Sequence, residues 1–507
     1  MAIEEKKGGN IAAIGMMFAL FFMIAFVTNL AGSMGVVVKN QFGASDMASQ
    51  FGSAANFFAY LFMGIPGGLI LKRKGYKFTS LLAVAIGIAG MGVQLASGYV
   101  QSFAVYVTGA FVAGFAMCLL NLVVNPLLNT LGGEGKKGNQ LVQFGCTLNS
   151  VGATLAPIFL GHLVGGEVAR AKVADAFPVM YVAIGIFALA FVVIALSRIP
   201  EPHMETTDEK QARLAGKASV VADIKATLGF RHFTLGAVAI FLYIIIESGI
   251  PNFMNLYMTS TEKVDEKVVT VQEADAFNES QKKADELAES VWNKKEEAAA
   301  AAAKLIGKDY KTQKYVKPVA KPGDKIVKAV KKTIDGKEVG VIETSKASAS
   351  YVGAAIAGVL VGAYWFCMMI GRLVGGVIGS KVSSRTMIVG CSILGMVLML
   401  ATMYTPLKMI TVCGYEFPLS MCFGVLCGLC TSVMWGGIFN MAAEGLGKYV
   451  PMGSGIFMAM VFGGMLLPVQ GWLAGAVGYL NSYWMTIGLF AYVLFYALVG
   501  SKVSKRA

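Results

Sequence analysis

The chain has 507 residues, of which 56% are hydrophobic and 14% are charged, whereas a soluble domain of average composition carries about 25% charged residues. The formal net charge of +13 does not mark a nucleic-acid-binding domain, because the basic residues gather in short segments between long uncharged stretches. This distribution excludes an ordinary soluble protein. It indicates an integral membrane protein, because an unpaired charge in lipid is costly.

Six apolar stretches, each long enough to cross a hydrocarbon core of about 30 Å, occupy the first part of the chain. We expect spans at 11–31, 48–71, 78–98, 102–128, 139–165 and 178–198. The first apolar run, Ile11–Leu30, is longer than the apolar core of a cleaved signal peptide. We therefore expect it to be a membrane span rather than a leader.

Six further spans follow a polar segment, and they are expected at 233–257, 351–379, 386–405, 416–442, 452–478 and 482–500. The pattern predicts an all-α membrane protein with 12 transmembrane helices in two six-helix halves. The expected domains are an N-terminal half (1–198), a cytoplasmic linker (199–232), helix 7 (233–259), an insertion (260–348) and the remainder of the C-terminal half (349–507).

The basic residues of the connections predict the orientation, because cytoplasmic loops carry an excess of Lys and Arg. If the N-terminus lies inside, the inside segments hold 20 such residues and the short outside loops hold 4. We therefore expect both termini in the cytoplasm, the insertion outside, and a multi-pass protein of a bacterial inner membrane.

The insertion has its own pattern, with 18 Lys and 16 acidic residues. Glu279–Leu305 is rich in Ala, Glu and Lys and predicts an amphipathic helix. An Asp-Gly turn within Thr333–Val339 predicts a β-hairpin. Two interpretations remain open for the whole segment, a compact cap and a solvated, mobile loop.

The two halves carry a similar element. Gly67-Gly68-Leu69-Ile70 ends the second span and Gly375-Gly376-Val377-Ile378 ends the eighth, and basic residues follow both. Two six-helix halves with parallel repeats, and a solute site at the midplane between them, are typical of major facilitator transporters. The chain resembles this superfamily.

More specific segments resemble one branch of it, the fucose–galactose–glucose proton symporters. They are the basic loop Gly68–Lys77, Asn125-Pro126 in the fourth span, Leu148–Ala153 in the fifth, Ile370–Leu373 in the eighth, and Gly453-Ser454 with Phe462–Pro468 in the eleventh. The resemblance covers nearly all the spans and leaves out the insertion. It implies secondary active transport of a small sugar-like solute, coupled to protons, by alternating access.

The chain departs from that branch where the branch carries its acids. Gly32 stands where the resemblance implies an acid in the first span, and Asn121 stands where it implies a Glu in the fourth. Cys146 replaces an expected Gln in the fifth span. Sodium coupling and facilitated transport without an ion therefore remain alternatives to proton coupling.

Glu247 is the acid that the sequence places near the middle of a span, and it is the candidate for proton coupling. An ionised, unpaired carboxylate at this depth costs several kcal/mol, so the side chain should face a cavity or stay protonated. The alternative is a neutral, hydrogen-bonded acid that only fixes helix packing.

Arg372 in the eighth span is the corresponding buried cation. A position near the cytoplasmic end would let its side chain snorkel toward the membrane surface. We expect a structural or gating role, and contact with the solute or with Glu247 is the alternative.

Neutral polar side chains suit a sugar, because amides, like hydroxyls, both donate and accept hydrogen bonds. Asn121 and Asn125 are four residues apart and share a helix face. Each amide could instead bridge helices, and Trp435 could pack in the core instead of stacking on a sugar. The candidate solute-binding residues are Asn29, Asn121, Asn125, Asn149, Asn252, Trp435 and Asn440, with Asn255 nearby.

The remaining function classes find little support. The eight cysteines lie mostly in apolar runs, and His162, His203 and His232 are scattered, so no metal, cofactor or catalytic residue is expected and the protein is not expected to be an enzyme. We expect contacts with lipid, a monomer, and no nucleic acid. A membrane sensor that kept the transporter frame is the competing class, and solute uptake into vesicles would distinguish the two.

Overall fold

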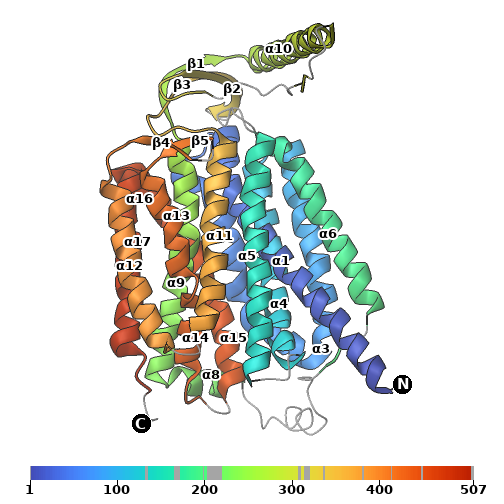
Figure 1. Ribbon diagram of the computed structural model, residues 1–507, viewed down its shortest axis with the longest axis vertical. Helices are drawn as coiled ribbons and strands as arrows, with labels where there is room; N and C mark the ends of the chain where they lie inside the picture. The colour runs from blue at the N-terminus through green and yellow to red at the C-terminus, as the bar shows by residue number, and fades with distance from the viewer. Residues whose placement is uncertain are drawn as a thin grey trace.

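The protein is described by a computed structural model that covers residues 2–131, 135–164, 172–197, 199–201, 220–305, 310–312, 320–334, 337–378, 382–412, 414–446 and 449–503. Long helices stand nearly upright beside one another, and a small sheet with one further helix lies across one end (Figure 1). We call that end the cap end. The opposite end, where both termini lie, is called the terminus end.

The first half of the chain folds into helices that agree with the expected spans. They are α1 (Ala2–Phe42), the short α2 (Asp46–Ser49), α3 (Phe51–Val100), α4 (Phe103–Leu131), α5 (Gly135–Val164), the 3₁₀ turn η2 (Val173–Ala176) and α6 (Phe177–Leu196).

The second half begins with α8 (Val220–Leu228) and α9 (Arg231–Met258) and resumes after the insertion. It continues with α11 (Ala354–Ile378), α12 (Ser384–Tyr404), α13 (Ser420–Thr431), α14 (Met434–Ala443), α15 (Val450–Met460), η4 (Val461–Leu466), α16 (Leu467–Val477), α17 (Tyr479–Phe495) and η5 (Tyr496–Gly500).

Eleven helical stretches of the described residues are long and apolar enough to cross a membrane, and α3 accounts for a twelfth crossing. A continuous helix of its 50 residues would be about 75 Å long, far more than a bilayer requires. Gly75 breaks it, with φ 82° and ψ 177°. Spans two and three are therefore two crossings joined by a turn, as the sequence predicted.

The turn at Gly75 is fastened to the end of α6. The Glu201 carboxylate accepts hydrogen bonds from the backbone N–H groups of Tyr76 and Lys77, the first N–H groups after the break. Lys77 Nζ donates to the carbonyls of Ala195 (2.7 Å) and Ser197 (3.0 Å), where a cation complements the helix C-terminus. The basic loop therefore serves helix capping inside the N-terminal half.

Two expected spans in the second half are interrupted, which the sequence reading did not foresee. The span expected at 416–442 breaks between Thr431 and Met434, and the one at 452–478 passes through the six-residue 3₁₀ turn η4. Within η4 a Cβ on Gly463 would lie 2.0 Å from the Phe241 carbonyl, so α9 approaches the turn at backbone distance. Broken spans expose backbone carbonyls inside the bundle.

The described part of the insertion is folded, in agreement with the compact-cap interpretation. Strands β1 (Thr261–Val269), β2 (Lys325–Ile334) and β3 (Lys337–Ala347) form an antiparallel sheet in the order β1-β3-β2. The predicted hairpin is confirmed by the pairing of Ile334 with Lys337, although its Asp-Gly turn lies outside the described residues. A second hairpin joins β4 (Met409–Val412) to β5 (Tyr415–Pro418).

Helix α10 (Val271–Leu305) begins eight residues before the predicted start at Glu279. Its true start is a capping box, in which Thr270 and Glu273 bond each other's backbone N–H groups. The bond from the Thr270 N–H lowers the pKa of the Glu273 carboxyl. Asn278 and Gln281 then bond carbonyls of β2, which attaches the helix to the sheet.

The turn at Gly75 supplies a stability test. In Gly75→Ala a left-handed alanine is strained, and its Cβ would lie 2.4 Å from Glu201 Oε2, so we expect a loss on the order of 1–2 kcal/mol. Gly68→Ala, in the same helix, is the control, because its Cβ would meet nothing within 4 Å. Thermal unfolding in detergent should show a lower midpoint for the first variant alone, and equal midpoints would contradict the capped turn.

Candidate functional site

The acid and the cation expected inside the membrane form an ion pair. Glu247 lies on α9 and Arg372 on α11, and Arg372 Nη2 is 3.5 Å from Glu247 Oε1. Their side chains retain 15% and 12% of their surface exposed, so the pair is largely withdrawn from solvent but not sealed. The pairing allows both charges to persist at this depth, because each compensates the desolvation of the other.

Tyr243 lies one helical turn before Glu247 on the same face of α9. Its hydroxyl is 2.9 Å from Glu247 Oε1 and 3.1 Å from the Thr431 carbonyl oxygen. A hydroxyl has one hydrogen to donate. It can therefore donate to an ionised Glu247, or it can donate to Thr431 while accepting a hydrogen bond from a protonated Glu247.

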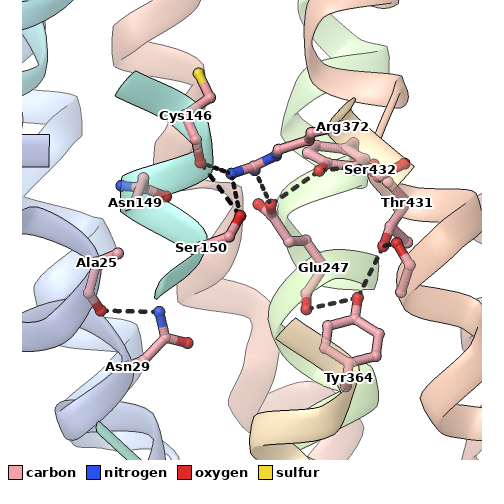
Figure 2. A network of polar contacts seen from close by, with 12 residues as sticks. Ala25, Asn29, Cys146, Asn149, Ser150, Glu247, Tyr364, Arg372, Thr431 and Ser432 are labelled. Carbon is pink, nitrogen blue, oxygen red and sulfur yellow. Dashed lines mark hydrogen bonds and ion pairs between the residues drawn. The ribbon is translucent and has the colours of Figure 1, made fainter. Parts of the chain in front are cut away.

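The break after α13 provides that second acceptor, because Thr431 is the last residue of the helix. Tyr364 of α11 reaches the same place, and its hydroxyl lies 3.2 Å from the Glu247 carbonyl oxygen and 3.1 Å from Thr431 Oγ1 (Figure 2). Three helices of the C-terminal half thus meet around one carboxyl group.

Arg372 also reaches across to the N-terminal half. Its Nη1 donates to the Cys146 carbonyl (2.9 Å) and to Ser150 Oγ (2.8 Å), both on α5. Figure 2 shows the guanidinium lying between these atoms and Glu247. The Arg372 side chain does not extend to the membrane surface. It joins the two halves, which suits the structural or gating interpretation, and it pairs with Glu247, which suits the alternative.

The asparagines of the N-terminal half divide into two groups. Asn149 donates to the Phe21 carbonyl at 3.1 Å and so bridges α5 to α1, which agrees with the packing interpretation. Asn29 donates to the Ala25 carbonyl of its own helix, at 2.9 Å, and its side chain is half-buried.

Asn121 and Asn125 lie together on α4, as their spacing predicted. Asn121 Nδ2 donates to the Tyr60 hydroxyl (3.1 Å), and Asn125 Nδ2 donates to the Asn121 carbonyl (3.0 Å). Both side chains are half-buried, so their amide oxygens can still serve other partners.

Gly32 stands where the resemblance implies an acid, and a side chain of the C-terminal half lies against it. A Cβ on Gly32 would lie 2.7 Å from Asn252 Oδ1, so the α9 amide occupies the space that a side chain on α1 would need. Asn252 Nδ2 donates to Gln50 Oε1 at 3.1 Å, and Gln50 is 1% exposed. Asn252 therefore joins the two halves.

The two remaining candidates lie on α14. Trp435 packs beside Tyr243, with ring centroids 6.4 Å apart, so it borders the Glu247 network. Asn440 is exposed, one turn before the end of α14, and it lies outside the network. The structure thus groups Trp435 with Glu247 and does not bring Asn440 to the same place.

The halves meet closely at the cap end. A Cβ on Gly161 of α5 would lie 2.5 Å from the Ala354 carbonyl of α11. On the other side of the bundle, Lys39 of α1 pairs with Asp46 of α2, and the Tyr479 hydroxyl of α17 bonds both. A cavity of about 20 Å³, lined by Ser33 and Asn255 among others, lies between the halves, which is room for about one water.

Sequence reasoning missed four members of the Glu247 network, Tyr243, Tyr364, Thr431 and Ser150, and it also missed Gln50, the partner of Asn252. A signal existed for Tyr243, because a polar residue four positions before a buried acid lies on the same helix face. The others depend on helix pairs that only the tertiary structure defines.

Residues 16–271, slightly more than half of the chain, match the family model of the Major Facilitator Superfamily. The chain belongs to the Major Facilitator Superfamily. It is a multi-pass, all-α membrane transporter, and the predicted fold class is confirmed.

Curated relatives include a glucose/galactose transporter of Brucella abortus (strain 2308), 22% identical over 95% of this chain and 92% of the relative. An L-fucose-proton symporter of Escherichia coli (strain K12) is 22% identical over 48% of this chain and 59% of that protein. Among solved structures, the E. coli fucose:proton symporter FucP gives a TM-score of 0.56 at 16% identity, covering 98% of this chain and all of that one. A D-xylose-proton symporter gives 0.57 at 13% identity, with 98% of each chain covered.

A double-mutant cycle tests the contact between Gly32 and Asn252. Gly32→Ala displaces the Asn252 amide from Gln50 and should lower stability by about 1 kcal/mol, as a lower thermal midpoint. In an Asn252→Ala background the same change should cost much less, because the obstructing amide is gone. Gly15→Ala, whose Cβ would meet nothing within 4 Å, is the control. Additive losses would show that the two residues do not interact.

Proposed function

We propose that this transporter moves a small sugar or sugar-like solute together with protons, by alternating access of the two halves. One observation carries the proposal: a membrane-embedded carboxyl, Glu247, has hydrogen-bond partners for both of its protonation states and is tied through Arg372 to the other half. The names of the relatives, transporters of glucose and galactose and symporters of fucose and xylose, support the solute class and the proton.

The coupling follows from charge. When Glu247 is ionised, it attracts the Arg372 guanidinium that also bonds α5, so the junction of the halves is held at both ends. Protonation removes the charge that Arg372 faces, and Tyr243 turns its hydrogen to the Thr431 carbonyl. The charge of Arg372 is then compensated only by its hydrogen-bond partners on α5 or by a bound solute. A proton thereby changes the relative free energies of the two arrangements of the halves, which is the requirement for coupling.

We assign solute binding to half-buried polar groups of the N-terminal half together with Trp435 of the C-terminal half. Asn29, Asn121 and Asn125 supply amides, the Tyr60 hydroxyl accepts from Asn121, and Trp435 borders the network from the C-terminal half. Amides match sugar hydroxyls in both directions, and an indole ring suits the apolar face of a sugar. Asn252 and Asn149 are assigned to contacts between helices.

We further propose how the protein is oriented in the membrane and on which side its two halves are closed. The excess of Lys and Arg supports an orientation with the terminus end in the cytoplasm and the cap end outside, in a bacterial inner membrane. The halves close against each other at the cap end, which this orientation puts on the outer side of the membrane. There are three alternatives: sodium coupling, transport without a coupling ion, and a membrane sensor that kept the transporter fold. We expect the protein to be a monomer.

Glu247→Gln should abolish uphill transport. In proteoliposomes with an imposed proton gradient, the wild type should accumulate galactose, glucose or fucose, and the variant should lose accumulation while it still exchanges labelled for unlabelled sugar. The amide keeps the size of the carboxyl but takes up no proton. Glu444→Gln, at the exposed end of α14, is the matched control. Gradient-driven accumulation by Glu247→Gln would refute proton coupling through this residue, and uptake driven by a sodium gradient would favour the alternative ion.

Tyr243→Phe tests the partner of the acid separately. It keeps the aromatic ring beside Trp435 but removes the hydroxyl that serves both protonation states, so the maximal rate should fall about tenfold, with a small change in KM. Tyr483→Phe is the matched control. The buried Tyr483 hydroxyl, on α17, bonds the Ile250 carbonyl of α9 and does not contact Glu247. Equal rates for the two variants would remove Tyr243 from the mechanism.

A further inference from the structure

The cap is part of the C-terminal half by sequence, yet it contacts the N-terminal half. Chain order places it between α9 and α11, and its sheet lies above the bundle at the cap end (Figure 1). Lys328 Nζ, on strand β2, donates to the carbonyl of Asn40 at 3.3 Å. Asn40 lies in the last turn of α1, where the helix dipole presents partial negative charge and favours a cation.

The lysine is held in place by the sheet itself. Lys328 pairs directly with Glu343 of β3, and Nζ lies 3.1 Å from Glu343 Oε2. The two side chains are only 11% and 8% exposed, so the ion pair is nearly buried. Because side chains alternate along a strand, Ile326 lies on the same face as Lys328, and it is 4% exposed within the core. This face of the sheet therefore packs against the bundle.

The contact lies where the halves must separate for the transporter to open outward. Lys39, one residue before Asn40, belongs to the cluster with Asp46 and Tyr479 that joins the halves at the cap end. Alternating access requires these ends to part. The cap, carried by α9 and α11, would then have to withdraw Lys328 from α1.

We propose that Lys328 is a gating residue, and that the cap acts through it as a clasp that holds the extracytoplasmic mouth closed. The proposal rests on the proposed alternating access but not on the identity of the solute or of the coupling ion. The Lys328–Glu343 pair positions the charge, and the C-terminal turn of α1 receives it. Loosening the clasp shifts the population toward the outward-open state.

Labelling of a buried position behind the gate tests this inference without any transport measurement. Ser33 of α1 is 6% exposed and lines the cavity between the halves. Ser33→Cys in the otherwise unchanged full-length chain should react with a membrane-impermeant maleimide, added from outside, only when the mouth opens. The chain that retains Ser33 gives the background from the native cysteines.

In the Ser33→Cys background, Lys328→Met keeps the aliphatic stem and removes the charge, and the labelling rate should rise about fivefold. Lys328→Arg, which keeps the cation, should return the rate to that of the parent. Lys331→Met is the matched control, because Lys331 lies on the opposite face of β2 and pairs with Asp275 of α10 inside the cap. It should leave the rate unchanged.

An unchanged rate in Lys328→Met would overturn the proposal. So would an equal rise in Lys331→Met, because that result would trace the effect to general loosening of the cap. If sugar transport proves to be driven by another ion, or to be absent, the labelling result still stands, so failure of the clasp and failure of the proposed function are distinguishable.

Discussion

A carboxylate and a guanidinium inside a membrane protein each need a partner, and the pairing of Glu247 with Arg372 is the constraint on which this structure depends. Breaking a buried ion pair leaves an uncompensated charge, so whatever changes one member must reorganise the other. Arg372 also bonds the Cys146 carbonyl and Ser150 of α5, which carries that reorganisation across the boundary between the halves. The gain of a proton at Glu247 is thereby connected to the arrangement of the two halves.

The helix breaks of the second half serve this arrangement. Thr431 ends α13; its carbonyl accepts a hydrogen bond from the Tyr243 hydroxyl, and its own hydroxyl is hydrogen-bonded to the Tyr364 hydroxyl beside Glu247. A continuous helix would use that carbonyl for its own ladder. The cap end shows the opposite design, with backbones in close approach at Gly161, an amide in place of a side chain at Gly32, and a lysine from the cap on α1. Polar groups that can exchange hydrogen-bond partners lie at the depth of Glu247. Close contacts between the two halves lie at the closed cap end.

The sequence was sufficient for the fold and for the principal charged residues. Hydrophobic length placed the spans, and the cost of charge in lipid singled out Glu247 and Arg372 before any contact was known. The breaks in the later spans were missed because both lie in uncharged stretches whose mean hydropathy, taken over the whole span, stays high across the break. For Arg372 the sequence allowed snorkelling as well as a structural or gating role, because its partners on α5 are distant in sequence. Asn149 and Asn121 could not be told apart by type, since an amide that bonds the backbone of another helix and one that bonds a tyrosine hydroxyl have the same sequence pattern.

Proton coupling through this site requires that the Glu247 carboxyl itself takes up and releases a proton. Infrared difference spectroscopy of the purified transporter, recorded between acidic and alkaline buffer with and without bound sugar, observes that group directly. A protonated-carboxyl C=O band should appear on acidification, change when sugar binds, and be absent from Glu247→Gln. A transport-competent protein without such a band, or the same band retained in Glu247→Gln, would contradict proton coupling through Glu247.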